Sequence, residues 1–191
     1  MHNAGANWRV REDFREGQLL LAVAVRDQLN LKPELMRAVP AAAGPWVGEE
    51  SPAAAASDDA RAEWEHWAGE ILSAAGERRV IPPTIFAPVI EDLHDHREWM
   101  RQWDEGRHRS FVESRHEGAM YAELVQEMQD AAGDDVVPAF DLSIRQLPLV
   151  AAGSGGGQPG VVIVSELLRS DPGAWRDAAR RHILSIAKSD G

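Results

Sequence analysis

The spacing of the apolar residues changes near residues 133–135, Gly-Asp-Asp. Before this point apolar residues recur at helical intervals. After it, Phe140, Leu142 and Ile144 alternate with polar residues, which is the period of a half-buried strand. Residues 161–164 are apolar at every position, as in a strand with both faces covered. Helices followed by strands predict an α+β fold.

We predict that the helices form a bundle. The strands are predicted to form a small antiparallel sheet at 137–168, which the final helix covers. The run 18–25 is apolar enough for either a helix or a buried strand, so its type stays open. The expected helical regions are 8–39, 58–75, 87–132 with an interruption near Gly106, and a last helix that begins at Asp171 and Pro172.

A chain of 191 residues fits a single domain spanning 1–191. Residues 40–57 are rich in proline and alanine and predict an internal linker, which Trp46 pins to the body of the protein. Residues 151–160 are rich in glycine and predict a flexible hairpin loop between the two strands.

Composition excludes several kinds of chemistry. The chain has no cysteine, so disulfides, thiol catalysis and cysteine-based zinc sites are excluded. The formal net charge of −11 disfavours binding to nucleic acid or to an anionic membrane surface, and a basic protein partner fits better. The N-terminus lacks a signal-peptide pattern and the longest apolar run, 19–25, is too short to cross a bilayer, so we expect a cytoplasmic protein.

A group of histidines and carboxylates is the first candidate site. His94, His108 and His116, with Glu117, are residue types that bind a divalent metal and activate water. However, His94 and His96 would point about 200° apart around a helix, and no two histidines of this group have the i,i+3 or i,i+4 spacing of helical ligands. We therefore expect neither a metal nor another cofactor.

The glycine-rich segment offers two further motifs. Residues 155–160 match the G-x-G-x-x-G string, but they precede a predicted strand, whereas a phosphate-binding loop opens a helix. Ser154 is not in a nucleophile elbow, because Ala152 stands where that motif requires glycine. The sequence therefore predicts neither a nucleotide site nor a serine nucleophile here.

The chain contains seven tryptophans but only one tyrosine. Trp64 and Trp67, and likewise Trp99 and Trp103, are spaced so that each pair lies on one helical face. Such stripes pack two helices together, line a ligand pocket or form a protein interface. These four residues are the candidate interaction or pocket residues.

No motif in the sequence identifies a reaction, so the sequence favours a protein that is not an enzyme. We interpret the chain as a non-catalytic interaction protein, either a regulatory subunit or a component of a larger assembly, with a protein partner or self-association. Two alternatives remain open. One is a metal-dependent hydrolase that uses the histidine and acid cluster at 94–117, and the other is a small-molecule binder with a tryptophan-lined pocket.

Overall fold

A computed structural model describes residues 8–13, 16–46, 57–74, 79–113, 117–132 and 139–189. Helices and a mixed sheet make the protein α+β, as the sequence predicts. The elements are β1 (Trp8–Asp13), α1 (Gly17–Gln28), α2 (Asp58–Ser73), η1 (Thr84–Phe86), α3 (Ala87–Asp92), η2 (Leu93–His96), α4 (Arg97–Glu113), α5 (Glu117–Ala132), β2 (Phe140–Leu147), β3 (Ser154–Gln158), β4 (Val161–Ser165), α6 (Glu166–Arg169) and α7 (Pro172–Ser189).

The sheet has four strands in the order β1-β2-β4-β3. β1 and β4 run parallel to β2, and β3 runs antiparallel to β4. The two strands expected from the sequence, β2 and β4, are neighbours, but the expected antiparallel direction is wrong. Two parallel neighbours need a return connection between them. β3 supplies that connection, so a strand occupies 154–158 where the sequence predicts only a loop.

β1 is a strand that the sequence analysis missed. Trp8 and Val10 are buried whereas Arg9 and Arg11 are exposed, which is the alternation of an edge strand with one covered face. The predicted helix over 8–39 is therefore wrong at its start, because α1 begins only at Gly17. The interruption expected near Gly106 is also absent, since α4 continues through that residue.

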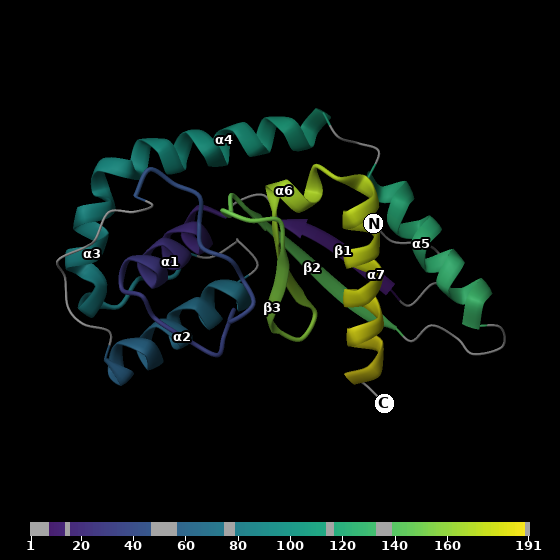
Figure 1. Cartoon of the computed structure of the whole chain (residues 1–191), viewed down its shortest axis with the longest axis horizontal. Coiled ribbons are helices and arrows are strands. Elements are labelled where there is room, and N and C mark those ends of the chain that lie inside the picture. Colours follow the sequence, from purple (N-terminus) through teal and green to yellow (C-terminus); the bar gives the residue numbers. More distant parts are fainter. Residues whose placement is uncertain are drawn as a thin grey trace.

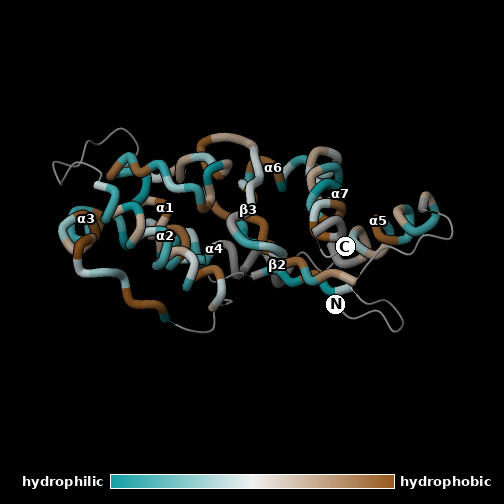
Figure 2. The backbone as a smooth tube through the Cα atoms, turned by 90° about the horizontal axis from the view of Figure 1, so that it is seen from below, coloured by the Kyte–Doolittle hydropathy of each residue, from teal (hydrophilic) through white to brown (hydrophobic). Residues whose placement is uncertain are grey.

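The helices lie on two sides of the sheet. In Figure 1, α1, α2 and α3 gather at one end of the molecule, α5 lies at the other, and α7 crosses in front of the sheet. α4 runs along the top from α3 towards α5. Seen from below, in Figure 2, the same order runs from α3 through the sheet to α7 and α5. We call α1 to α3 and the adjoining part of α4 the helical half.

Two apolar cores meet at the sheet. Val162 and Val164 belong to the core formed with α5 and α7, whereas Ile163 belongs to the core of the helical half. β4 therefore presents one face to each core, which explains why the whole run is apolar. β2 divides in the same way, with Leu142 and Ile144 in one core and Leu147 in the other.

α1 is the centre of the helical half. Residues 22–25 of this helix are fully buried, and contacts with α2, α3 and α4 surround it. A helix that is apolar on all sides belongs inside a core, so the open question about the run 18–25 is answered in favour of a helix. The sequence pattern of residues 18–25 did not distinguish a helix from a strand, because a fully buried helix and a fully buried strand are both apolar along their length.

The segment after α1 is held by its side-chain bonds. Arg26 donates to the carbonyl oxygens of Val39 and Pro40 at 3.1 and 2.9 Å, and Asp27 accepts the amide of Ala42 at 2.7 Å. Trp46 is 1% exposed, so it anchors the start of the predicted linker as expected. Residues 47–56 of that linker lie outside the described residues.

A buried ion pair joins the sheet to the helical half. Glu16, just before α1, accepts from Arg145 of β2 at 3.3 Å, and the two side chains are 1% and 2% exposed. Arg145 also donates to the carbonyl oxygen of Leu72 in α2 at 3.2 Å. A single guanidinium therefore connects β2, α1 and α2.

We expect Glu16→Ala to lower the free energy of unfolding by about 3–5 kcal/mol, because Arg145 would lose this carboxylate while staying buried. Urea denaturation measures this loss. The matched control is Asp141→Ala, which removes the exposed pair of Asp141 and Arg11 and should cost about 0–1 kcal/mol. Equal losses in the two variants would contradict the structural role of the buried pair.

Candidate functional site

Of the predicted metal cluster, only the side chain of His94 lies within the described residues. His94 is exposed, and His96 is half-buried with its ring 5.9 Å from that of Trp46. Among the side chains that the structure describes, no three histidine or acidic groups are placed to share a metal ion. The side chains of His108, His116 and Glu117 lie outside the described residues, so their part of the hypothesis stays a prediction.

The tryptophans of α2 are core residues. Trp64 is fully buried and its indole N–H donates to the carbonyl oxygen of Ala22 in α1 at 2.7 Å. Trp67 is 2% exposed and stacks on Phe86, with ring centroids 5.8 Å apart. Neither side chain is exposed enough to form part of an interface with another molecule.

The tryptophans of α4 lie at the edge of the same core and are half-buried. Trp99 meets the ring of Trp46 edge to face at 5.3 Å. Trp103 donates its N–H to the Glu166 carboxylate of α6 at 2.7 Å. α1 contacts both α2 and α4, the helices that carry the four tryptophans. An interface or pocket at Trp99 and Trp103 stays a prediction.

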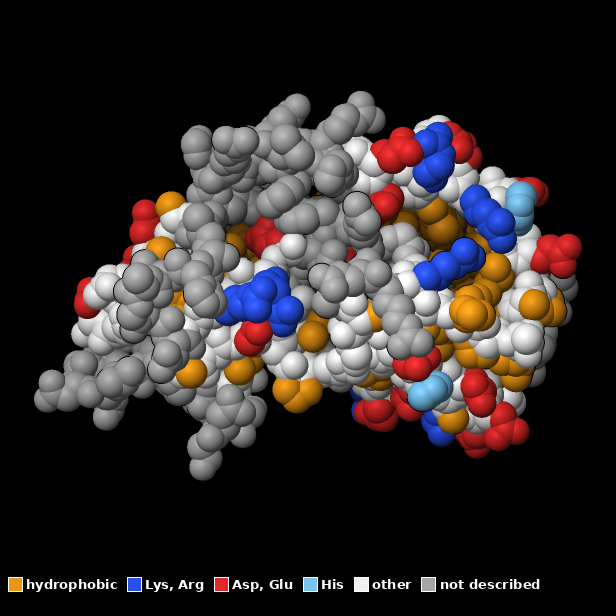
Figure 3. All heavy atoms as spheres, turned by 180° about the vertical axis from the view of Figure 1, so that it is seen from behind, with side chains coloured by type: hydrophobic (Ala, Val, Ile, Leu, Met, Phe, Trp, Pro, Cys, Tyr) orange, Lys and Arg blue, Asp and Glu red, His pale blue; other side chains and the backbone are white. Residues whose placement is uncertain are grey.

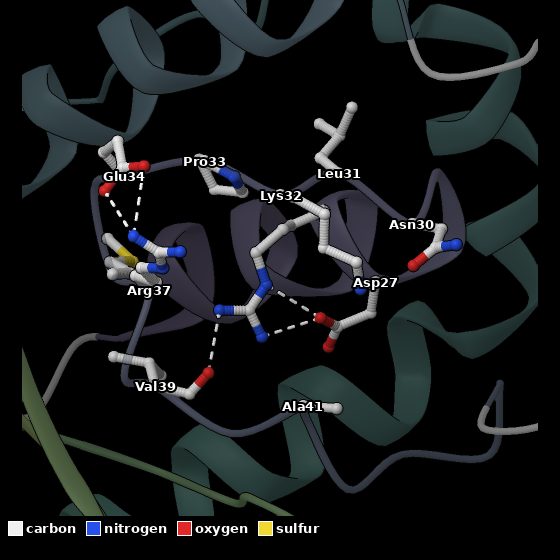
Figure 4. Close-up of a pocket in the computed structure, with 11 residues that line it drawn as sticks. Asp27, Asn30, Leu31, Lys32, Pro33, Glu34, Arg37, Val39 and Ala41 are labelled. Carbon is white, nitrogen blue, oxygen red and sulfur yellow. Dashed lines mark hydrogen bonds and ion pairs between the residues drawn. The ribbon is translucent and has the colours of Figure 1, made fainter.

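One cavity, of about 470 Å³, lies between the end of α1 and the segment that follows it. Figure 4 shows Asp27 of α1 and Val39 of the following segment beside this cavity. Arg26 donates to the Asp27 carboxylate at 2.8 Å and to the carbonyl oxygen of Val39 at 3.1 Å. Burial raises the pKa of Asp27, although the neighbouring Arg26 opposes this effect. Arg37 pairs with Glu34 at 3.2 Å on the rim. These pairings hold the fold of the segment together, which favours a structural role for the cavity.

A second cavity, here called the α2 groove, has a volume of about 700 Å³. It lies between the second half of α2 and residues 79–81. Glu70 and His66 line one side, and Val80 and Ile81 line the other. The groove therefore combines a charged wall with an apolar lip.

The apolar lip continues into an exposed segment. Ile81 is 81% exposed and Ile85 is 50% exposed, and two prolines lie between them in sequence. In Figure 3, the view from behind, hydrophobic side chains gather over the helical half, at the right of the picture. We call residues 80–85 the apolar segment. Nothing in its sequence pattern marked it, because exposure depends on which neighbours cover a side chain.

A third cavity, of about 710 Å³, lies between β3, β4 and α7. We call it the β3–α7 cavity. Ser154 at the start of β3 lies 3.0 Å from the Nε2 atom of His182 in α7. The sequence analysis missed this pair because it placed Ser154 in a loop, and because a separation of 28 residues on two different elements leaves no local pattern.

The glycine string does not form a phosphate loop. It runs along β3 and then turns into β4, so no helix begins at it. Gly160 at this turn has φ of +74°, and a Cβ atom there would lie 2.6 Å from the carbonyl oxygen of Asp141. Glycine is therefore required here by the turn and by the close approach of β2.

Comparisons with known proteins identify no relative. No family model matches the chain, and neither the curated proteins nor the solved structures contain a match. Within the described segments, no helix has both the length and the apolar composition needed to cross a bilayer.

We expect Trp67→Ala to lower the free energy of unfolding by about 3–5 kcal/mol, because it leaves a large cavity between α2 and η1. Trp99→Ala should cost clearly less, because Trp99 is half-buried at the edge of the core. Urea denaturation of both variants tests the ranking. A larger loss for Trp99→Ala would contradict the conclusion that Trp67 is more deeply buried in this core than Trp99.

Proposed function

We propose that the chain is an interaction component, a regulatory subunit or a part of a larger assembly, that binds a basic protein through the α2 groove and the apolar segment. The observation that carries this proposal is the exposure of Ile81 and Ile85 next to a groove. Exposed apolar side chains next to a cavity are typical of binding surfaces.

The charge of the surface favours a basic partner. Besides Glu70, the outer face of α2 carries the exposed acidic residues Asp58, Asp59 and Glu63. With a formal net charge of −11, the chain repels other acidic proteins, nucleic acid and a second copy of itself. The acidic residues of α2 favour arginine or lysine in the partner segment, and Val80 and Ile81 favour apolar side chains next to them. Arg79 also lines the groove and leaves room for one acidic group in the partner.

The two parts of the surface would contribute differently. Burial of an exposed isoleucine contributes at most about 1.5–3 kcal/mol, so Ile81 and Ile85 supply affinity. The acidic residues of α2 steer the approach of a basic partner and mainly change the association rate. Trp99 and Trp103 are not required for this mode of binding, because neither lines the groove.

The test is affinity capture from an extract of the source cells, with wild-type protein and the double variant Ile81→Ser, Ile85→Ser as baits. We expect one or a few basic proteins to be lost from the variant by tenfold or more. Leu184→Ser is the matched control, because it removes an exposed apolar side chain from α7. Light scattering on the purified chain tests self-association independently.

Charge reversal provides a second prediction. Glu63→Lys combined with Glu70→Lys should slow the association with a captured partner by about tenfold at low salt, with a smaller difference at high salt. Surface plasmon resonance at two salt concentrations measures this effect.

In the capture experiment, recovery of the same proteins by the wild type and the isoleucine variant contradicts the proposed surface, and so does capture of acidic proteins only.

A further inference from the structure

Ser154 and His182 form a hydroxyl–imidazole pair in the β3–α7 cavity. The Oγ atom of Ser154 lies 3.0 Å from Nε2 of His182, and both side chains are half-buried. This distance is within the reach that proton transfer between a nucleophile and a base requires. The pair is therefore placed to pass a proton and remains accessible from the cavity.

Rigid elements hold the two side chains in place. Ser154 pairs with Val164 in the sheet, so its backbone position is fixed by β4. His182 precedes Ile183, which is fully buried in the core between α7 and the sheet. The register of β3 and the packing of α7 together set the distance between the two groups.

The cavity has room for a small substrate beside the pair. Gly155, Gly156 and Gly160 form part of its wall, so the backbone itself is exposed to the cavity. Apolar atoms come from Val161 and Ile186, among others. The glycines beside Ser154 carry no side chains that would fill this part of the cavity, and its apolar part suits an acyl group.

The charge state of His182 suits a general base. Burial, helped by the neighbouring Arg181, lowers the pKa of His182 below its usual value. The imidazole is therefore neutral at pH 7, the form that accepts a proton. Asp141 also lines the cavity, but both of its carboxylate oxygens accept from Arg11 of β1, at 3.2 and 3.0 Å. The chemistry thus rests on two residues, Ser154 and His182.

We propose that Ser154 and His182 form an acyl-transfer site that hydrolyses small carboxylic esters with an apolar acyl group. This activity goes beyond the proposed interaction function and uses a separate cavity. Ser154 Oγ would bond to the ester carbonyl carbon while Nε2 of His182 takes the hydroxyl proton. The bond to the alcohol then breaks, and His182 returns the proton to the leaving oxygen.

Water completes the cycle. His182 takes a proton from water, the hydroxide adds to the acyl carbon, and the bond between that carbon and Oγ breaks. Ser154 regains its proton from His182 as the carboxylic acid leaves. The net reaction consumes one ester and one water and yields an acid and an alcohol, with no oxidant or reductant.

The first experiment measures whether His182 activates the nucleophile. The chain contains no cysteine, so Ser154→Cys introduces a single thiol that iodoacetamide can report. We expect alkylation at pH 6.5 to be about tenfold faster in Ser154→Cys than in Ser154→Cys combined with His182→Gln, because the imidazole takes the thiol proton and the resulting imidazolium stabilises the thiolate. Circular dichroism confirms that both variants fold.

The second experiment uses the unmodified chain with a fluorophosphonate probe and with p-nitrophenyl butyrate. The probe should form one bond from phosphorus to Ser154 Oγ with loss of fluoride, seen by peptide mass spectrometry. Both the adduct and ester hydrolysis should fall at least tenfold in His182→Gln and Ser154→Ala. Leu167→Ser in α6, which changes an exposed side chain that does not line this cavity, should leave both unchanged.

Three results overturn the proposal. The first is equal alkylation with and without His182, which would mean that the hydrogen bond only fastens β3 to α7. The second is an activated thiol without an adduct on Ser154, because acyl transfer needs an accessible nucleophile as well as a base. The third is hydrolysis that persists in Ser154→Ala, which would place the activity elsewhere.

Discussion

The ion pair of Glu16 and Arg145 sits where the sheet meets the helical half, and the relative placement of the two cores depends on it. Charges this deeply buried are destabilising unless they are paired, so the pair favours the observed position of α1 on β2. Arg145 also reaches Leu72, which ties the end of α2 to the same point. The walls of the α2 groove and of the β3–α7 cavity are built on these elements.

A second polar network fastens the other side of the sheet. Arg169 of α6 donates to Glu12 of β1 at 3.0 Å and lies over the ring of Trp175, and Tyr121 of α5 donates to Glu12 at 2.7 Å. β1, α5, α6 and α7 thus meet around the ion pair of Arg169 and Glu12. With α7 fixed against the sheet, the separation between His182 and β3 is set by the fold.

Much of the fold follows from local patterns. The helical spacing around Trp64 and Trp67 predicts α2, the alternation at Phe140, Leu142 and Ile144 predicts β2, and the apolar run at 161–164 predicts β4. Proline at the first position of α7 correctly marks its start. β3 was not predicted because a glycine-rich strand has no apolar period. β1 was not predicted because only two apolar residues, Trp8 and Val10, mark it.

The sequence by itself determined the class of fold, most helices and the two central strands, because periodicity is read within a few residues. The tertiary structure alone decided that β2 and β4 are parallel, that Glu16 meets Arg145, and that Ser154 meets His182. It also decided that Trp64 and Trp67 are core whereas Ile81 is exposed. Each of these depends on residues brought together from distant parts of the chain, and no local pattern carries that information.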